Sequence, residues 1–282
     1  MMHNSDFNEQ QQLGSKTAKG GFQNEKDVVG KFINYKSDQE AQEWLEIMGY
    51  DIYSIQSLEA KQIPTRLSRS KAHEYNISDD SFDFTQKYKK ADIQVQLSIT
   101  VDGIIYRENI SLKKANVNAN FNQIDKRPVD TYQEMWGFNS NIANTLKKFT
   151  GEIPPNEHEA ANLQLKDKKK RRFYLDELPV DEVQELLMFF EENKSLIFND
   201  ILRGRGKLAA EWFLVTKIDI NNEYSWILKN INEVVNFYMG GSIELTNQGG
   251  LKLGRLTAQR KGGTPDPTSL QFKINPNALF SI

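Results

Sequence analysis

The sequence predicts an α/β (α+β) protein, because segments with strand periodicity and segments with helix periodicity both run through the chain. The clearest strands form a hairpin over 91–114, where apolar and polar residues alternate on either side of Asp102-Gly103. Apolar residues at helical spacing mark segments such as 17–34 and 180–190. From 242 onward the chain returns to short strands separated by glycine-containing turns.

The composition limits the class of protein and of partner. A chain of 282 residues can bury a sizeable core, and a net charge of −2 means that a nucleic-acid site would have to be a local basic patch. The chain has no cysteine, which excludes disulfides and thiolate metal sites and agrees with a reducing cytoplasm. We find neither a signal-peptide core nor an apolar run of membrane-spanning length, and we expect a disordered tail over 1–12.

The hairpin brings titratable side chains together. A two-residue turn sets a register in which Asp92 lies opposite Lys113 and Gln94 lies opposite Ser111. Directly opposed side chains lie about 5 Å apart at Cβ. A carboxylate, a hydroxyl and an ammonium therefore converge at one end of a half-buried hairpin. This group is either an ion pair on a solvated face or part of a catalytic site.

These residues match the needs of phosphodiester hydrolysis, which are a cation, carboxylates that hold it and an activated water. Asp92 supplies one carboxylate, and Glu25 supplies another from the apolar stripe of the 17–34 helix, unless it lies at a helix edge that reaches solvent. The backbone carbonyl of Leu112 is a further candidate metal ligand. Lys113 can orient or deprotonate the attacking water, and Ser111 can assist.

The second half of the chain fits a DNA partner. Residues 259–263 and 271–273 carry Gln, Arg and Lys, the side chains that contact phosphates and base edges, although an ordinary polar sheet face has the same composition. Phe121, in a loop predicted over 115–127, either wedges between base pairs or anchors its loop on the core. The basic run 168–172 is either a solvated linker or a phosphate contact.

Several local predictions can be compared directly with a structure. The stretch 64–87 is polar without a clear period, so we expect an irregular surface excursion. The segment 156–172 is hydrophilic. We expect the last two strands, 252–261 and 270–274, to present their polar residues from separate faces.

Short blocks spread over most of the chain from about residue 14 form a pattern that is far more specific than the hairpin alone. The blocks are Gly14–Lys19, Asn24–Asp27, Phe121–Lys126, Tyr132–Trp136, Phe149–Glu152 with Pro154–Pro155, Asp200–Gly206, Ala209–Trp212, Ile231–Val234, Gln259–Gly263 and Leu270–Lys273. Taken together they resemble the type II restriction endonucleases of the HinP group, the GCGC-cutting enzymes related in fold to MspI.

This resemblance implies a PD-(D/E)XK restriction-endonuclease-like core, with a mixed central β-sheet flanked by helices, that uses Mg²⁺ to cut double-stranded DNA. Position by position, it makes Asp92 the metal-binding aspartate and Lys113 the catalytic lysine. Two positions depart from the family pattern. Ser111 stands where the family has glutamine, and Ala91 stands where it has serine. The stretch around 66–85 looks inserted.

The resemblance also implies DNA contacts. Phe121 and Gln123 fall where this group inserts residues into the minor groove, and the two C-terminal blocks would read the major groove. The residues expected to bind DNA are Phe121, Asn122, Gln123, Lys126, Arg203, Arg205, Gln259, Arg260, Lys261, Gln271 and Lys273.

The resulting hypothesis is a Mg²⁺-dependent type II restriction endonuclease of the bacterial cytoplasm with a short palindromic target, GCGC. We expect a single endonuclease domain over 13–282, with a catalytic core over about 13–150 and a DNA-recognition part over about 170–282. Two alternatives stay open, namely a catalytically inactive DNA-binding protein of the same fold and a structure-specific repair nuclease. The sequence leaves open whether the protein acts as a monomer or as a homodimer, and it implies no membrane and no other protein partner.

Overall fold

A computed structural model describes residues 23–90, 94–115, 121–221, 223–261 and 268–282. The fold has two five-stranded sheets with helices, so the predicted α/β class is confirmed. Asp92, Ala91 and the predicted tail over 1–12 lie outside the described residues.

The described chain forms two compact units that interleave in sequence. The first, here called the β3 unit, contains 23–122, Leu202–Val235 and Pro276–Ile282. The second, the β9 unit, contains Gln123–Ile201 and Asn236–Asn275. The helices over 129–150 thus belong with the C-terminal strands, and the strands over 212–230 belong with the hairpin. The single domain over 13–282 stays a prediction.

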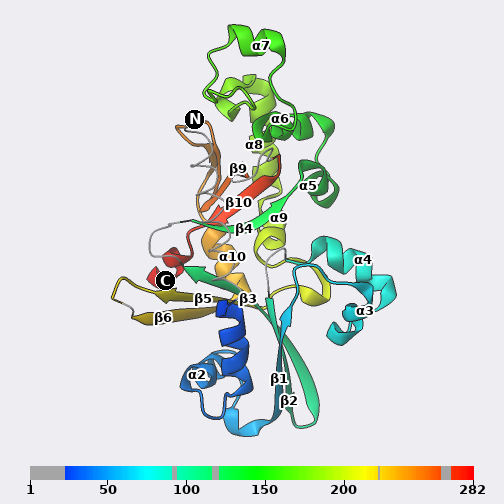
Figure 1. The fold of residues 1–282 in the computed structure, drawn as a ribbon, viewed down its shortest axis with the longest axis vertical. Coiled ribbons are helices and arrows are strands. Elements are labelled where there is room, and N and C mark those ends of the chain that lie inside the picture. The colour runs from blue at the N-terminus through cyan, green and yellow to red at the C-terminus, as the bar shows by residue number, and fades with distance from the viewer. Residues whose placement is uncertain (1–22, 91–93, 116–120, 222, 262–267) are drawn as a thin grey trace, which may run out of the picture. The chain divides into compact units, whose positions relative to one another are not determined.

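The β3 unit is built on a mixed sheet, as the resemblance implied (Figure 1). Its strand order is β1-β2-β3-β5-β6, with β3 and β5 parallel and the other neighbours antiparallel. The strands are β1 (Ile55–Ile63), β2 (Gln94–Val101), β3 (Ile104–Ala115), β5 (Trp212–Ile218) and β6 (Tyr224–Asn230).

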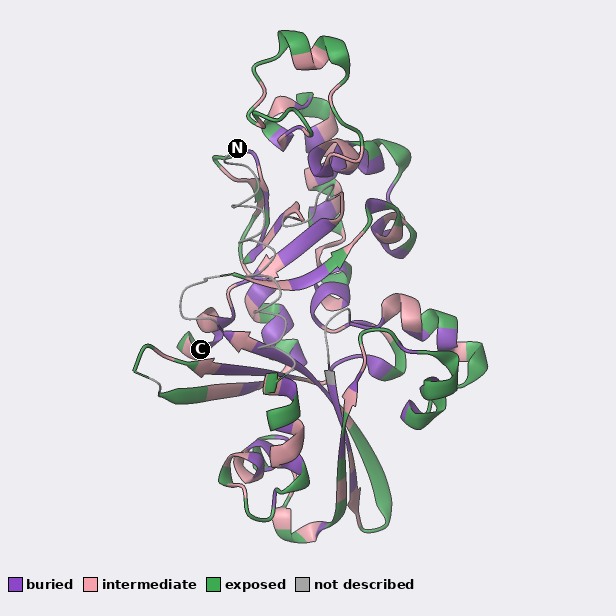
Figure 2. Ribbon diagram, in the orientation of Figure 1, coloured by how far each residue is buried: buried purple, intermediate pink, exposed green. Residues whose placement is uncertain are grey.

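The β2–β3 hairpin has the predicted register. Asp102 and Gly103 have φ values of 51° and 75°, the pair of positive angles that a type I′ hairpin turn requires. Gln94 lies opposite Ser111, as expected. The pairing of Asp92 with Lys113 lies outside the described residues. The hairpin tip is exposed, whereas the strand segments near the sheet centre are buried (Figure 2).

Two helices cover one face of this sheet. A helix over 23–33 buries Val28 and Phe32, and α2 (Gln39–Ile47) buries Trp44, all within one core cluster with the strands. The Asp38 carboxylate caps α2 by accepting a hydrogen bond of 3.0 Å from the backbone N–H of Ala41. Two short helices, η1 (Ile52–Ser54) and η5 (Pro276–Ser281), complete this part.

The stretch expected to be irregular over 64–87 is instead helical, so that prediction was wrong. It contains α3 (Arg69–Ala72), η2 (His73–Tyr75) and α4 (Asp79–Tyr88). Their apolar residues form a small core of their own with Ile63 and Leu208. The helices are too short to show a clear period, because the chain reverses at Asn76, whose φ is 60°.

The β9 unit has a second sheet, of order β4-β10-β9-β8-β7. Its strands are β4 (Asn122–Arg127), β7 (Ile243–Leu245), β8 (Leu251–Leu253), β9 (Leu256–Arg260) and β10 (Leu270–Ile274). Most of β4 was expected to be loop, which was wrong. Its polar sequence conceals the strand because pairing with β10, far away in sequence, supplies the backbone partners.

Helices accompany this sheet. They are α5 (Val129–Trp136), α6 (Ser140–Thr150), α7 (Glu157–Asn162), η3 (Leu175–Glu177), α8 (Val180–Glu192) and α9 (Lys194–Leu202). A further helix, α10 (Ile231–Met239), begins within the residues of the β3 unit and ends within those of the β9 unit. Tyr132 and Trp136 of α5 stack at 4.5 Å between ring centroids, and both meet Phe272 of β10 edge-on. This aromatic cluster fixes which face of β10 is buried. None of the described helices combines the length and apolarity of a membrane span.

Candidate active site and DNA-binding sheet

Ser111 and Lys113 project from one face of β3, and Leu112 between them projects from the other. Leu112 packs in the core cluster beneath the helices. Lys113 is only 8% exposed and Ser111 is fully buried. A solvated ion pair, the alternative left open by the sequence, would require an exposed lysine. The burial of Lys113 therefore excludes an ion pair on a solvated face.

The Ser111 hydroxyl is a buried polar group whose hydrogen bonds are not satisfied by the described residues. Its Oγ is buried and has no hydrogen-bond partner among the described residues. A buried hydroxyl without a partner costs about 1–3 kcal/mol, so such a group usually serves a bound water, ion or substrate. Asp92 would lie two positions further along the paired strand, outside the described residues.

Glu25 sits at the start of the 23–33 helix and is only 7% exposed, which excludes a helix edge open to solvent. Its carboxylate accepts a hydrogen bond from the side-chain amide of Gln62, at the end of β1. The neighbouring Asn24 accepts a hydrogen bond of 2.9 Å from Thr216 Oγ1 on β5. These contacts hold the helix start across β3, on the face that carries Leu112. Glu25 thus starts from the face opposite to Lys113, and it would share a metal ion with residues of the Lys113 face only around the end of the strand.

Gln62 was missed by the sequence analysis. A signal for it exists, because Leu58, Ala60 and Gln62 alternate along β1 on the face that packs against the helices. A glutamine at the third inward position needs a polar partner.

The oxygen donors fit a hard divalent cation. Carboxylates and backbone carbonyls are the ligands that Mg²⁺ prefers, and Glu25, Asp92 and Leu112 would provide them. The orphaned Ser111 Oγ could add a neutral oxygen. No cluster of three acidic or histidine side chains occurs within the part of the chain that the structure describes, which does not include Asp92.

The loop with Arg203 and Arg205 lies in the β3 unit, where it supports the segment that leads to Asp92. The Arg205 guanidinium lies 4.4 Å from the ring centroid of Tyr88, and its backbone N–H donates to the Tyr88 carbonyl at 3.0 Å. Gly204 has φ of 76°, and a Cβ there would lie 2.9 Å from Lys90 N. Only glycine permits both this conformation and this close approach.

A buried polar network lies on the Ser111 face of the same sheet. Gln96 donates to Asn109 Oδ1 at 2.9 Å, and Asn109 Nδ2 donates to the carbonyls of Lys207 and Ala209. The backbone N–H of Asn109 donates to Glu211 at 2.8 Å. Burial raises the pKa of Glu211, although this hydrogen bond opposes the shift. The network fixes the 207–211 segment against β3.

The DNA-binding residues predicted near the C-terminus meet on one face of the second sheet. Gln259 of β9 lies directly opposite Gln271 of β10, and Thr257 lies opposite Lys273. Directly paired residues share a face, so the prediction of two separate polar faces was wrong. The error arose because the sequence does not show how β9 and β10 pair.

Three lysines gather on this face. Lys261 alternates with Gln259 and so lies on the same face. Lys126 of β4 lies between Asp125 and Arg127, which contact each other. Asp125 accepts a hydrogen bond from buried Tyr132, so Lys126, one residue further on, points to the other face of the sheet. Burial, together with the neighbouring charges of Lys126 and Lys273, lowers the pKa of Lys261. Burial also lowers the pKa of Lys273. Cations held together in this way suit an anionic partner.

Arg260 points away from this face. It pairs with Leu270, whose side chain is buried, and its guanidinium approaches Gly151 at the end of α6. The structure therefore brings together Gln259, Lys261, Gln271, Lys273 and Lys126, and it separates Arg260 from them.

Phe121 is 50% exposed, so it does not anchor its loop in the core. The next residue, Asn122, donates from Nδ2 to the Lys114 carbonyl at 2.7 Å, and its Oδ1 is buried with no partner in the described chain. Gln123, at the start of β4, is half-buried. The exposed ring of Phe121 thus lies next to Asn122, whose side chain is hydrogen-bonded to the end of β3.

Fold and site together define a nuclease-like protein with a mixed sheet, a buried lysine at a strand end and a separate cationic sheet face. A family model described as R.HinP1I restriction endonuclease matches residues 83–280, which is most of the chain. The chain belongs to this family and is a type II restriction endonuclease, a site-specific DNA hydrolase.

Among solved structures, the chain resembles restriction endonuclease MspI, which was crystallised in complex with its cognate DNA. The TM-score is 0.56 at 14% sequence identity, and the match covers 95% of this chain and 96% of that chain. The likeness confirms the fold. A comparison with curated protein sequences gave no match.

Proposed function

We propose that this restriction endonuclease cuts double-stranded DNA at GCGC with Mg²⁺, using Asp92, Glu25, Ser111 and Lys113. The observation that carries this proposal is the hairpin register. Gln94 lies opposite Ser111, so continuation of the same pairing would bring Asp92 opposite the buried Lys113. Directly opposed residues lie about 5 Å apart at Cβ. Metal-assisted hydrolysis of a phosphodiester could then use the carboxylate to hold the metal ion and the lysine to act on the attacking water.

The roles follow from the chemistry of each group. When bound, Mg²⁺ would neutralise charge on the scissile phosphate, held by the carboxylates of Asp92 and Glu25 and the carbonyl of Leu112. The Lys113 side chain would orient the attacking water as an ammonium, or take up its proton as a neutral amine. The Ser111 hydroxyl, which has no partner in the described chain, would accept or donate one further hydrogen bond.

Recognition would fall to the β9–β10 face and to Phe121. Lysines donate to O6 and N7 of guanine in the major groove, and a GCGC site presents guanine on both strands. Lys261 and Lys273 are therefore suited to this target, with Gln259 and Gln271 beside them. The exposed ring of Phe121 and the adjacent Gln123 would insert from the minor groove. A restriction enzyme acts on incoming DNA, so its place would be the bacterial cytoplasm.

The test is digestion of a plasmid in the presence of Mg²⁺, followed by sequencing of the fragment ends. Ends that all derive from GCGC would support the proposal, and ends at another site would overturn the target. The variant Asp92→Ala serves as the inactive control. Binding of duplex without any cutting would indicate the inactive DNA-binding alternative, and a preference for junctions or flaps would indicate a repair nuclease.

A further inference from the structure

The basic run that the sequence left unassigned forms an ordered turn, here called the basic turn (167–172). The Asp167 carboxylate accepts hydrogen bonds from the backbone N–H groups of Lys169 at 3.2 Å and Arg171 at 3.1 Å. Its carbonyl accepts one from the Lys170 N–H at 2.7 Å. One aspartate therefore organises the backbone, and its negative charge is largely engaged there.

The basic turn is anchored and is not a loose linker. The backbone N–H of Phe173, which is buried, donates to the Lys148 carbonyl on α6 at 3.1 Å. The Arg172 guanidinium lies 4.2 Å from the ring centroid of Tyr174 and 5.6 Å from that of Phe149. A cationic segment held against helix and aromatic rings loses little entropy on binding a partner.

The tip of the basic turn presents charge to solvent. Lys168 and Lys169 are exposed, and neither forms an ion pair with any residue that the structure describes. The Arg171 guanidinium lies 3.8 Å from the Asp167 carboxylate, a long ion-pair contact. The surface thus offers cations whose charge is not matched locally.

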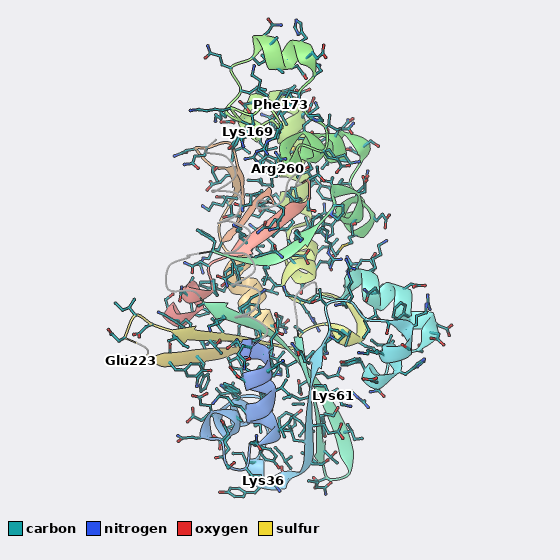
Figure 3. The ribbon with its side chains drawn as sticks, in the orientation of Figure 1. Lys36, Lys61, Lys169, Phe173, Glu223 and Arg260 are labelled. Carbon is teal, nitrogen blue, oxygen red and sulfur yellow. The ribbon has the colours of Figure 1, made fainter. Side chains whose placement is uncertain are left out.

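The basic turn lies near the end of β9, the strand that carries Gln259 and Arg260. A Cβ on Gly151 would lie 2.5 Å from the Arg171 carbonyl oxygen and 3.3 Å from Cζ of Arg260. Arg260 therefore reaches from the end of β9 to the basic turn, away from the face of Gln259. Figure 3 labels Lys169, Phe173 and Arg260, which come from these two neighbouring segments of the β9 unit.

We propose that the basic turn, together with Arg260, binds the phosphate backbone of DNA flanking the recognition site. This inference rests on the proposed function, since it requires a DNA substrate. Exposed lysines without base-reading neighbours contribute affinity through counterion release and carry no sequence information. The surface would therefore strengthen binding to long DNA without changing the site that is cut.

The test compares Lys168→Ala/Lys169→Ala with the unaltered protein on two duplexes, one restricted to the target and one with long flanks. On the long duplex, the slope of log affinity against log salt should fall in magnitude by about 1.8 for two lost phosphate contacts. On the short duplex the two proteins should have equal slopes. The control is Lys36→Ala/Lys71→Ala, which removes two exposed lysines from the β3 unit and should leave both slopes unchanged.

An unchanged slope on the long duplex, or an equal loss on both duplexes, would overturn this inference. Failure of the proposed function has a different signature, because the unaltered protein would then fail to cut GCGC in the plasmid digest. Melting curves of the double variant should match those of the unaltered protein, since both side chains are exposed.

Discussion

The side-chain amide of Gln62 donates a hydrogen bond to the carboxylate of Glu25, and so joins the end of β1 to the first turn of the 23–33 helix. The two residues are 37 positions apart in the chain, so no local sequence pattern predicts their contact. A buried carboxylate is stable only when its charge is compensated. The contact therefore holds Glu25 in place at the end of the sheet where Lys113 lies near the end of β3.

Replacing Gln62 with leucine removes this donor while keeping a similar volume. We expect the free energy of unfolding to fall by roughly 1–3 kcal/mol, because the buried carboxylate loses a partner. Urea unfolding measures the change. Gln39→Leu is the matched control, since Gln39 is exposed and its loss should cost less than about 0.5 kcal/mol. Equal stability of Gln62→Leu and the unaltered protein would show that the contact is not formed.

Ser111→Ala separates a structural from a functional role of the orphaned hydroxyl. Because Oγ has no partner among the described residues, its removal should leave the free energy of unfolding unchanged or raise it by about 1 kcal/mol. Cleavage should need more Mg²⁺ to reach half its maximal rate. A clear loss of stability in metal-free buffer would mean that the hydroxyl has a structural partner.

Lys113→Ala should lower the single-turnover cleavage rate at least about 100-fold, the range expected for loss of a group that positions or activates water. DNA affinity, measured by fluorescence anisotropy, should change little. Lys114→Ala is the control, because alternation along β3 directs Lys114 to the opposite face. Comparable cleavage by both variants would refute the assignment of Lys113.

DNA affinity should depend on pH through Lys261. Its pKa lies below the ordinary 10.5 because of burial and of Lys126 and Lys273, and bound phosphate or guanine would raise it again. Below the lowered pKa the lysine is charged in both states, and affinity is highest. Above it the free protein must take up a proton to bind, so affinity falls as pH rises.

Anisotropy titrations from neutral to alkaline pH measure this trend, and Lys261→Arg, which stays charged, should flatten it. The stability of the DNA-free protein, in contrast to the DNA affinity, should rise with pH. Since the pKa of Lys261 is lower in the folded than in the unfolded state, the charged lysine opposes folding, and stability rises as pH passes the lowered pKa. A pH profile that is identical in the arginine variant would exclude Lys261 as its source.

Gly204→Ala should destabilise the protein by about 1–3 kcal/mol, because alanine is strained at φ of 76° and its Cβ would meet Lys90 N at 2.9 Å. The displaced segment leads to Asp92, so cleavage should fall as well. Thermal melting and single-turnover rates measure the two effects. Gly30→Ala is the control, since nothing lies within 4 Å of a Cβ there and φ is not positive. Normal melting of Gly204→Ala would contradict the close approach.

The hairpin could be predicted from sequence because its determinants are local. A two-residue Asp102-Gly103 turn and strict alternation leave one register, and the structure has Gln94 opposite Ser111. The family could also be predicted, because its blocks are short contiguous strings. The α/β class and the mixed sheet followed from the same evidence.

Other features depend on partners far away in the chain. The strand character of β4 depends on β10, and the shared face of Gln259 and Gln271 depends on how β9 pairs with β10. The helices within 69–88 are too short to show a period, and they are stabilised by a common core with Leu208.

The sequence by itself determined the register at the centre of the candidate site, because turn geometry and period-two alternation act between neighbouring residues. Only the tertiary structure decided that Lys113 and Glu25 are buried and that Gln62 donates a hydrogen bond to Glu25. It also decided that Arg260 points away from the face of Gln259 and lies near the basic turn. Burial and long-range hydrogen bonds arise when distant segments pack, and no local pattern records which segments those will be.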